Sequence, residues 1–107
     1  MDQVDLLVEI LLDKNASVAE RDDAAMYLGE YDDDRALAAL IKICVDKSED
    51  EFIFANCGQS VASIWVKRNK FNKKIYDEMV PESQWEVYYY INGNKPEWIK
   101  EYELQRP

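Results

Sequence analysis

Apolar residues recur along this chain at intervals of three and four positions, the spacing that gathers them on one face of an α-helix. Small and polar residues interrupt this spacing, as the turns between helices do. The pattern predicts four helices in the first two thirds of the chain, over about residues 3–13, 18–30, 34–46 and 50–67.

Polar residues mark the predicted helix starts. Asp2, Ser17 and Ser48 are the expected N-caps, because a short polar side chain can accept a hydrogen bond from the free N–H groups of a first turn. Glu20 follows Ser17 by three positions, as in a capping box. The acidic turn 32–34 suits the positive end of the third helix.

The C-terminal third is predicted to hold a shorter pair of helices rich in aromatic residues. One of them carries Phe71 and Met79, and the other starts at Pro81, since proline is favoured in the first turn of a helix. Residues 92–94 (Asn-Gly-Asn) are expected to break the second helix, and Pro96 to open a last short one.

One segment of the sequence recurs after 33 positions. Residues 7–14 (LVEILLDK) match residues 40–47 (LIKICVDK), with apolar opposite apolar and Asp-Lys closing both. Two helices per period indicate a helical solenoid, whose terminal repeats are usually atypical, so we interpret the aromatic tail as a cap. The core between the first two repeats is predicted to contain Ala24, Leu28, Leu40, Ile43, Cys57, Val61 and Ile64.

Residues 27–40 (YLGEYDDDRALAAL) closely resemble the HEAT repeats of the phycobilisome-lyase type, in which an Ala-rich helix ends in Leu-Gly, an acidic turn follows and the next helix begins with Arg-Ala. The matching positions are Arg21, Ala24, Ala25, Leu28, Gly29, Arg35, Ala36, Leu37 and Leu40. The resemblance implies an all-α fold: a short right-handed α-solenoid of about three stacked HEAT-like hairpins with a degenerate aromatic C-terminal cap, in a single domain over residues 1–107. It implies a binding role without selecting a ligand.

The charge of the chain is acidic and unevenly distributed. There are 22 Asp and Glu against 13 Lys and Arg, and residues 1–62 hold 15 of the acidic side chains but only 5 of the basic ones. Such a field repels phosphate backbones, so we expect no direct nucleic-acid binding and instead a basic protein partner. We interpret the basic run 67–74 as support for a helix C-terminus and for nearby acids, rather than as a nucleic-acid patch.

The residue types do not indicate catalysis. The chain has no histidine, which excludes Ser-His-Asp and Cys-His sites and the His-containing zinc sites. Carboxylates are plentiful, but acidic residues ordinarily gather at helix starts and on solvated faces. We therefore predict no enzyme activity, no metal site and no cofactor. Cys44 and Cys57 fall at apolar positions and are predicted to be reduced core residues.

No secretory or membrane-spanning segment is predicted. Glu9 interrupts the apolar run near the start, and no stretch approaches the roughly 20 apolar residues of a membrane span. We expect a cytoplasmic protein that makes no membrane contact.

The second helix of each pair lines the concave side in HEAT solenoids, and we predict that this side binds the partner. The outward-facing polar residues there are Asp23, Tyr27 and Glu30, followed 33 positions later by Asn56, Gln59 (or Ser60) and Ser63. Plain solvent exposure is the alternative interpretation of this stripe.

Two further residues complete the predicted partner-binding set. Asp33 belongs to the acidic turn, and Tyr89 lies among three consecutive tyrosines. Three consecutive tyrosines of one helix cannot all be buried, and exposed tyrosines often anchor protein interfaces. The alternative for these aromatic residues is burial in the cap.

Two kinds of binding function fit these properties. The first is a bacterial immunity or antitoxin protein that neutralises a basic, nuclease-type toxin domain by tight binding. In its general character the chain resembles the immunity proteins of contact-dependent growth inhibition, being short, acidic and without catalytic residues. The alternative is a HEAT-repeat scaffold, adaptor or accessory protein that binds another basic protein or peptide. A neighbouring gene for a toxin with a nuclease-like C-terminal domain would favour the first.

Overall fold

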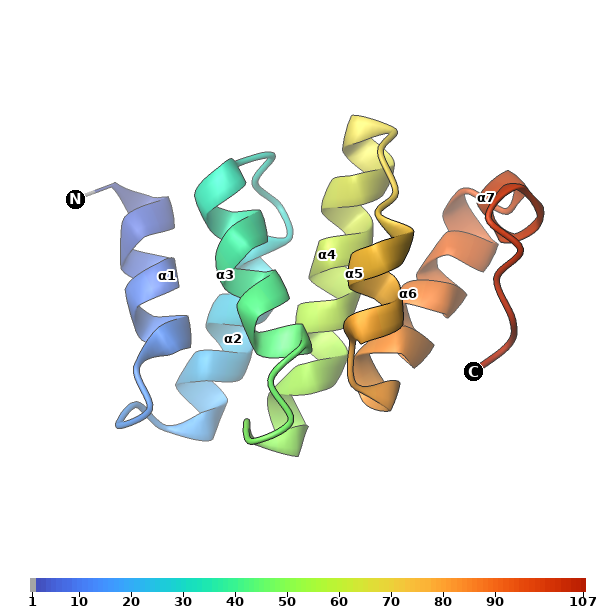
Figure 1. The fold of residues 1–107 in the computed structure, drawn as a ribbon. Coiled ribbons are helices and arrows are strands. Elements are labelled where there is room, and N and C mark those ends of the chain that lie inside the picture. The colour runs from blue at the N-terminus through green and yellow to red at the C-terminus, as the bar shows by residue number, and fades with distance from the viewer. Residues whose placement is uncertain (1) are drawn as a thin grey trace.

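The structure, a computed structural model, describes residues 2–107, and every regular element in this range is helical (Figure 1). The elements are α1 (Gln3–Leu12), α2 (Val18–Leu28), α3 (Asp34–Cys44), η1 (Glu51–Ile53, a 3-10 turn), α4 (Phe54–Arg68), α5 (Lys73–Glu78), α6 (Pro81–Asn94) and α7 (Glu97–Glu101). The predicted all-α class is confirmed. The first three helices end within two residues of their predicted limits.

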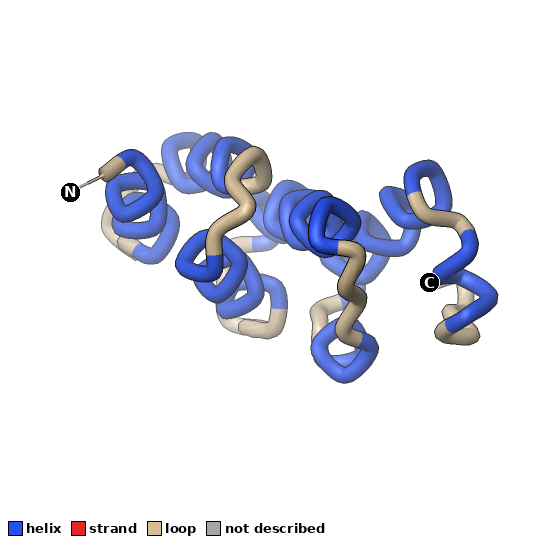
Figure 2. The backbone as a smooth tube through the Cα atoms, turned by 90° about the horizontal axis from the view of Figure 1, so that it is seen from above, coloured by secondary structure: helices blue, strands red, loops and turns tan. Residues whose placement is uncertain are grey.

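The helices lie side by side in two rows (Figures 1 and 2). α1 contacts α3 in one row, and α4 contacts both α2 and α6 in the other, which we call the α2–α4–α6 row. α5 lies in front of α6 in Figure 1 and contacts it. α4 is therefore the central helix, with a neighbour on either side in its own row and α3 packed across from it.

The first two predicted N-caps are confirmed. Asp2 Oδ1 accepts a hydrogen bond from the N–H of Asp5 at 2.9 Å, and Ser17 Oγ accepts one from the N–H of Glu20 at 3.1 Å. The Glu20 carboxylate accepts a bond from the Ser17 hydroxyl at 2.9 Å, which holds the cap in place. Each cap satisfies a first-turn donor that the helix itself leaves free.

The prediction that Ser48 caps the fourth helix is wrong. Ser48 lies in the turn after α3, where its N–H and hydroxyl both donate to Asp46 Oδ1, at 2.9 and 2.6 Å. Asp50 stands directly before η1 instead, and its Oδ1 accepts from the N–H of Phe52 at 2.9 Å. Asp50, which directly precedes the first turn, is therefore the N-cap of the segment formed by η1 and α4.

The prediction that residues 92–94 break the sixth helix is also wrong, because α6 continues through Asn94. The N–H of Lys95 donates to Ile91 O at 2.7 Å, and the Asn94 side chain donates to Tyr90 O at 2.9 Å. These bonds satisfy carbonyls of the last turn, so an Asn-Gly-Asn segment can remain helical there. α5 is shorter than expected and begins after Asn72, which caps it, so Phe71 precedes the helix.

The predicted core between the first two repeats is confirmed. All seven residues are buried, namely Ala24, Leu28, Leu40, Ile43, Cys57, Val61 and Ile64. They belong to one apolar cluster that runs from Val4 in α1 to Leu104 beyond α7.

Phe71, between α4 and α5, is the centre of an aromatic cluster at the C-terminal end of this core. Its ring centroid lies 5.2 Å from that of Trp65, 5.6 Å from that of Trp98 and 4.8 Å from that of Tyr102. The tail thus packs back onto the last turn of α4. Edge and tilted ring contacts of this kind add to the stabilisation from burial alone.

Candidate functional site

A shallow cleft of about 290 Å³ opens on the α2–α4–α6 row. Most of its lining residues carry a polar group, and they come from all three helices of the row: the C-terminal end of α2, one face of α4 and one tyrosine of α6. The lining residues are Met26, Gly29, Glu30, Asn56, Gln59, Ser60, Ser63, Lys67 and Tyr90.

Small residues let α2 and α4 approach closely at the floor of the cleft. A Cβ atom on Gly29 would lie 2.4 Å from Ser60 Oγ, so any larger residue would require movement. The Ser60 hydroxyl donates to Ala25 O at 2.7 Å, which satisfies a buried polar group. This bond ties α4 to the backbone of α2.

The C-terminal end of α2 receives two further bonds from α4. Gly29 O accepts from Lys67 Nζ at 3.0 Å and from Ser63 Oγ at 3.4 Å. The Lys67 ammonium offsets the partial negative charge at this helix end. The adjacent Glu30 is exposed, and among residues 2–107 it takes part in no salt bridge.

α4 and α6 meet through a second glycine–serine contact. A Cβ atom on Gly58 would lie 2.6 Å from the backbone oxygen of Ser83. The buried Ser83 hydroxyl donates to Phe54 O at 3.0 Å. α4 therefore makes a close contact on each side, and together the two contacts fix the spacing of the row.

Four of the eight predicted binding residues meet in the cleft: Glu30, Asn56, Gln59 and Ser63. Two others, Asp23 and Tyr27, are exposed on α2 but lie outside the lining. The Asn56 amide donates to both carboxylate oxygens of Asp22 at 3.0 Å, which joins the acidic side of α2 to the first turns of α4.

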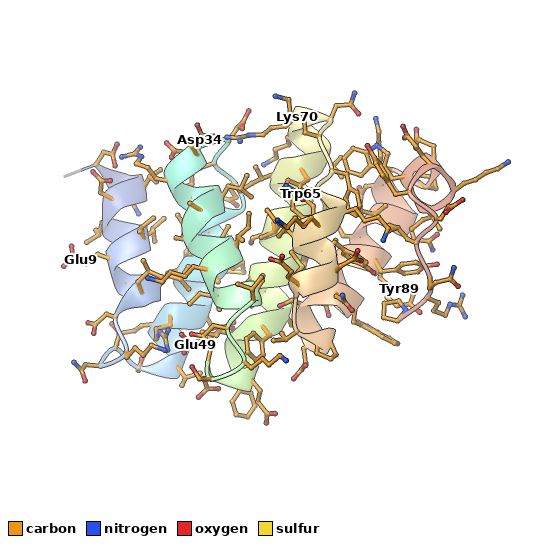
Figure 3. The ribbon with its side chains drawn as sticks, viewed as in Figure 1. Glu9, Asp34, Glu49, Trp65, Lys70 and Tyr89 are labelled. Atoms are coloured by element: carbon orange, nitrogen blue, oxygen red, sulfur yellow. The ribbon has the colours of Figure 1, made fainter. Side chains whose placement is uncertain are left out.

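The structure puts Asp33 and Tyr89 outside the cleft. Asp33 caps α3, and its carboxylate binds the Arg35 guanidinium at 2.7 Å, which lowers the pKa of Asp33 to about 2. Tyr89 is half-buried on α6, with its ring centroid 4.6 Å from that of the more exposed Trp85 (Figure 3). The next residue, Tyr90, lines the cleft in its place.

Sequence reasoning missed four lining residues, namely Met26, Gly29, Lys67 and Tyr90. Met26 precedes the predicted Glu30 by one helical turn, and Lys67 follows the predicted Ser63 by one turn, so the neighbours four positions away from these two residues include both. Tyr90 could not be found this way, because its place depends on how α6 packs against α4.

Many acidic residues outside the cleft are neutralised within the chain. Arg35 binds Asp2, Asp5 and Asp33 at 2.7–3.1 Å, which joins the starts of α1 and α3. Arg68 binds Asp32 and Asp34 at the end of the rows where Figure 3 labels Asp34 and Lys70. Lys67 and Arg68 thus act as expected of a basic run that supports a helix end and nearby acids.

Arg21 and Glu49 form a buried ion pair at the opposite end, where Figure 3 labels Glu49. The Arg21 guanidinium also donates from Nε to Leu11 O at 2.9 Å, and Lys14 Nζ donates to Glu49 Oε2 at 3.1 Å. The hydrogen bonds from Arg21 lower the pKa of Glu49 to about 2. This network fixes the loop that leads into η1.

Cys44 and Cys57 are free, buried thiols, as predicted. Burial raises the pKa of Cys44 to about 12 and that of Cys57 well above its ordinary value, so both are protonated at neutral pH. In the described part of the chain, no three Cys, Asp or Glu side chains are grouped so that they could hold a metal ion.

Comparisons with known protein families, with curated proteins and with solved structures gave no match. No helix within residues 2–107 is both long and apolar enough to cross a lipid bilayer. The function must therefore be inferred from the cleft, the charges and the repeat of this chain.

Proposed function

We propose that the chain is a short HEAT-type α-solenoid that binds a basic protein on its α2–α4–α6 row. The 33-residue repeat relates α1 to α3 and α2 to α4. Equivalent helices are in contact, as expected when successive hairpins stack in one register. The aromatic cluster around Phe71 would then cap the third hairpin.

The exposed acidic side chains that stay unpaired beside the cleft are the observation that carries this proposal. Arg35 and Arg68 neutralise five carboxylates at one end of the rows. Asp23, Glu30 and Glu51 belong to the α2–α4–α6 side, are exposed, and within the described residues form no salt bridge. Their field is available to attract positive charge on another protein.

The partner we favour is the basic, nuclease-type domain of a bacterial toxin, and the chain would be its cytoplasmic immunity protein. A nuclease carries positive charge because it must hold nucleic acid. A neutralising protein gains speed and specificity from a matching acidic face, and it needs no catalytic residues of its own.

The test uses the purified C-terminal domain of a toxin encoded next to this chain's gene. Association and dissociation rates are measured over a range of salt for the wild type and for the Asp23→Lys, Glu30→Lys double variant. We expect association to slow by about tenfold or more in the variant, because these exposed charges steer the encounter. Salt should slow wild-type association in the same way, since the screening length is only about 8 Å at physiological ionic strength.

Glu9→Lys with Glu78→Lys is the matched control. Both residues are exposed, lie on α1 and α5, and change the net charge by the same amount. This control should stay within about threefold of the wild-type association rate. An Asp23→Lys, Glu30→Lys double variant that associates at the wild-type rate would refute the proposal. Binding of a different basic protein, with the same charge dependence, would instead favour the scaffold alternative.

A further inference from the structure

Phe52 is the most exposed large hydrophobic side chain of residues 2–107, with 73% of its surface open to solvent. Its neighbours Ile53 and Phe54 are buried, so the chain turns two of three consecutive apolar residues into the core and leaves the third outside. A phenylalanine so exposed adds nothing to the core. It is available for contact with another molecule.

The backbone that carries Phe52 is held firmly. The N–H of Phe52 donates to Asp50 Oδ1 at 2.9 Å, and the N–H of Asp50 donates to Glu49 Oε1 at 3.1 Å. Glu49 is itself held by two bonds from Arg21 at 2.8 Å each. Since the 3-10 turn is tied to the interior through this chain of bonds, little backbone entropy remains to be lost when Phe52 is bound.

Phe52 also belongs to the proposed binding side. It stands four positions before Asn56, the first α4 residue of the cleft, and η1 packs against α2. Asn56 holds the Asp22 carboxylate beside this turn at 3.0 Å, and Glu51 is exposed next to Phe52. The exposed Phe52 thus lies next to the exposed Glu51 and directly before α4, the helix that carries Asn56 of the cleft.

We propose that Phe52 is the hydrophobic anchor of this face and inserts into an apolar pocket of the partner protein whose rim carries arginine or lysine. The inference rests on the proposed function, because the acidic surroundings of Phe52 fit the same basic partner. Interface anchors are commonly aromatic side chains that fill a pocket, while charges around them set specificity.

Trp85, another exposed aromatic residue, is a weaker anchor. Its indole packs against the Tyr89 ring at a tilt of 47°, with ring centroids 4.6 Å apart, and it is 49% exposed. In the described chain Phe52 makes no such ring contact. Trp85 therefore serves as the matched aromatic control.

The experiment has a cross-linking arm and a kinetic arm. The photoreactive residue p-benzoylphenylalanine is introduced at position 52, 27 or 85 of the full chain in its own host cells, and adducts are identified by mass spectrometry. The captured protein is then purified, and its binding rates are measured with the wild type, Phe52→Ala and Trp85→Ala. Urea unfolding of Phe52→Ala checks that removing an exposed side chain leaves stability unchanged.

We expect an adduct at position 52 with a basic protein. Phe52→Ala should accelerate dissociation from that protein by about 30-fold, with association and its salt dependence unchanged, whereas Trp85→Ala changes dissociation by less than about threefold. A cross-link at position 27 without one at position 52 would show that Phe52 is not the anchor, and so would a Phe52→Ala protein that dissociates at the wild-type rate. Either result leaves the proposed function standing. No adduct at 27 or 52 overturns both. An adduct at 52 only with a second copy of this chain overturns the anchor in favour of self-association.

Discussion

Arg21 of α2 and Glu49 of the α3–α4 loop form a two-pronged ion pair in the interior, with Nη1 to Oε1 and Nη2 to Oε2 both at 2.8 Å. The Arg21 and Glu49 side chains are only 5% and 4% exposed. A third bond, from Nε of Arg21 to Leu11 O, brings the end of α1 into the same contact. Removing either ion would leave the other buried without its partner.

Replacing Arg21 with methionine should lower the free energy of unfolding by about 3–5 kcal/mol, because the buried Glu49 carboxylate would keep only the exposed Lys14 as a counter-ion. Urea unfolding followed by circular dichroism measures the change. The double variant Arg21→Met, Glu49→Leu should recover much of the loss, since it removes both charges. Lys73→Met, which breaks an exposed i,i+4 pair with Asp77, should cost less than about 0.5 kcal/mol. Equal losses in Arg21→Met and Lys73→Met would contradict this account.

The Arg21–Glu49 ion pair should also make the free energy of unfolding depend on pH under acidic conditions. The pKa of Glu49 is about 2 in the folded chain, against an ordinary value of 4.5, so the unfolded chain takes up this proton first. The contribution of Glu49 is therefore fully present above pH 4.5 and is lost as the pH falls toward 2. Unfolding free energies of the wild type and of Glu49→Gln should differ by a constant amount above that window and converge within it. A difference that grows on acidification would refute the assignment.

Gly58 and Gly93 should respond in opposite ways to alanine. A Cβ on Gly58 would meet the backbone of Ser83 at 2.6 Å, so α4 and α6 must separate, at a cost of about 1–3 kcal/mol. A Cβ on Gly93 would meet nothing within 4 Å, and alanine there should raise stability by up to about 1 kcal/mol through its better helix propensity. Thermal or urea unfolding of the two variants checks the contrast. A stable Gly58→Ala protein would show that the α4–α6 contact is looser than described.

Leu40 is fully buried between the first two repeats. Leu40→Ala should reduce the unfolding free energy by about 2–5 kcal/mol, the range for a core leucine replaced by alanine. Leu6→Ala is the matched control, because Leu6 is exposed on α1, and should cost less than about 1 kcal/mol. A Leu40→Asp protein as stable as the wild type would show that Leu40 is not part of the core.

The thiols of Cys44 and Cys57 should be unreactive toward a disulfide reagent such as Ellman's reagent at pH 8 until the chain unfolds. Both are buried and their raised pKa values keep them protonated, whereas the thiolate is the reactive form. Replacing both with alanine should leave partner binding intact and lower stability. Rapid modification of the folded chain, or loss of binding in a folded double variant, would reveal a role beyond packing.

Helix positions and the core between the first repeats could be predicted from the sequence because both depend on local spacing. Leu28 and Val61 are buried as the repeat requires. The C-terminal third was harder to predict. An Asn-Gly-Asn segment ordinarily marks a turn, but here the Asn94 side chain donates to Tyr90 O and α6 continues through Asn94. The central place of Phe71 in the aromatic cluster could not be predicted, because it depends on the tail folding back onto α4.

The candidate site was predicted in part for the same reason. Glu30, Asn56, Gln59 and Ser63 follow from helical periodicity and the repeat, and the cleft contains all four. Asp33 looked equally acidic in the sequence, but it is the N-cap of α3 and its carboxylate is bound by Arg35 two positions later, a local contact that the charge pattern alone did not indicate. Phe52 could not be singled out, because η1 exposes it while burying its two apolar neighbours on its C-terminal side.

Gly29 determines the shape of the α2–α4–α6 row without contributing charge to it. Because its missing side chain is what allows Ser60 to sit against α2, the volume at position 29 sets the distance between two helices of the row. A larger residue would act as a wedge, opening the cleft and changing the curvature of the face without altering the charge of any side chain. The curvature of this face and its attraction for positive charge therefore depend on different residues. A substitution at position 29 can change how well a partner fits without changing how fast the partner associates.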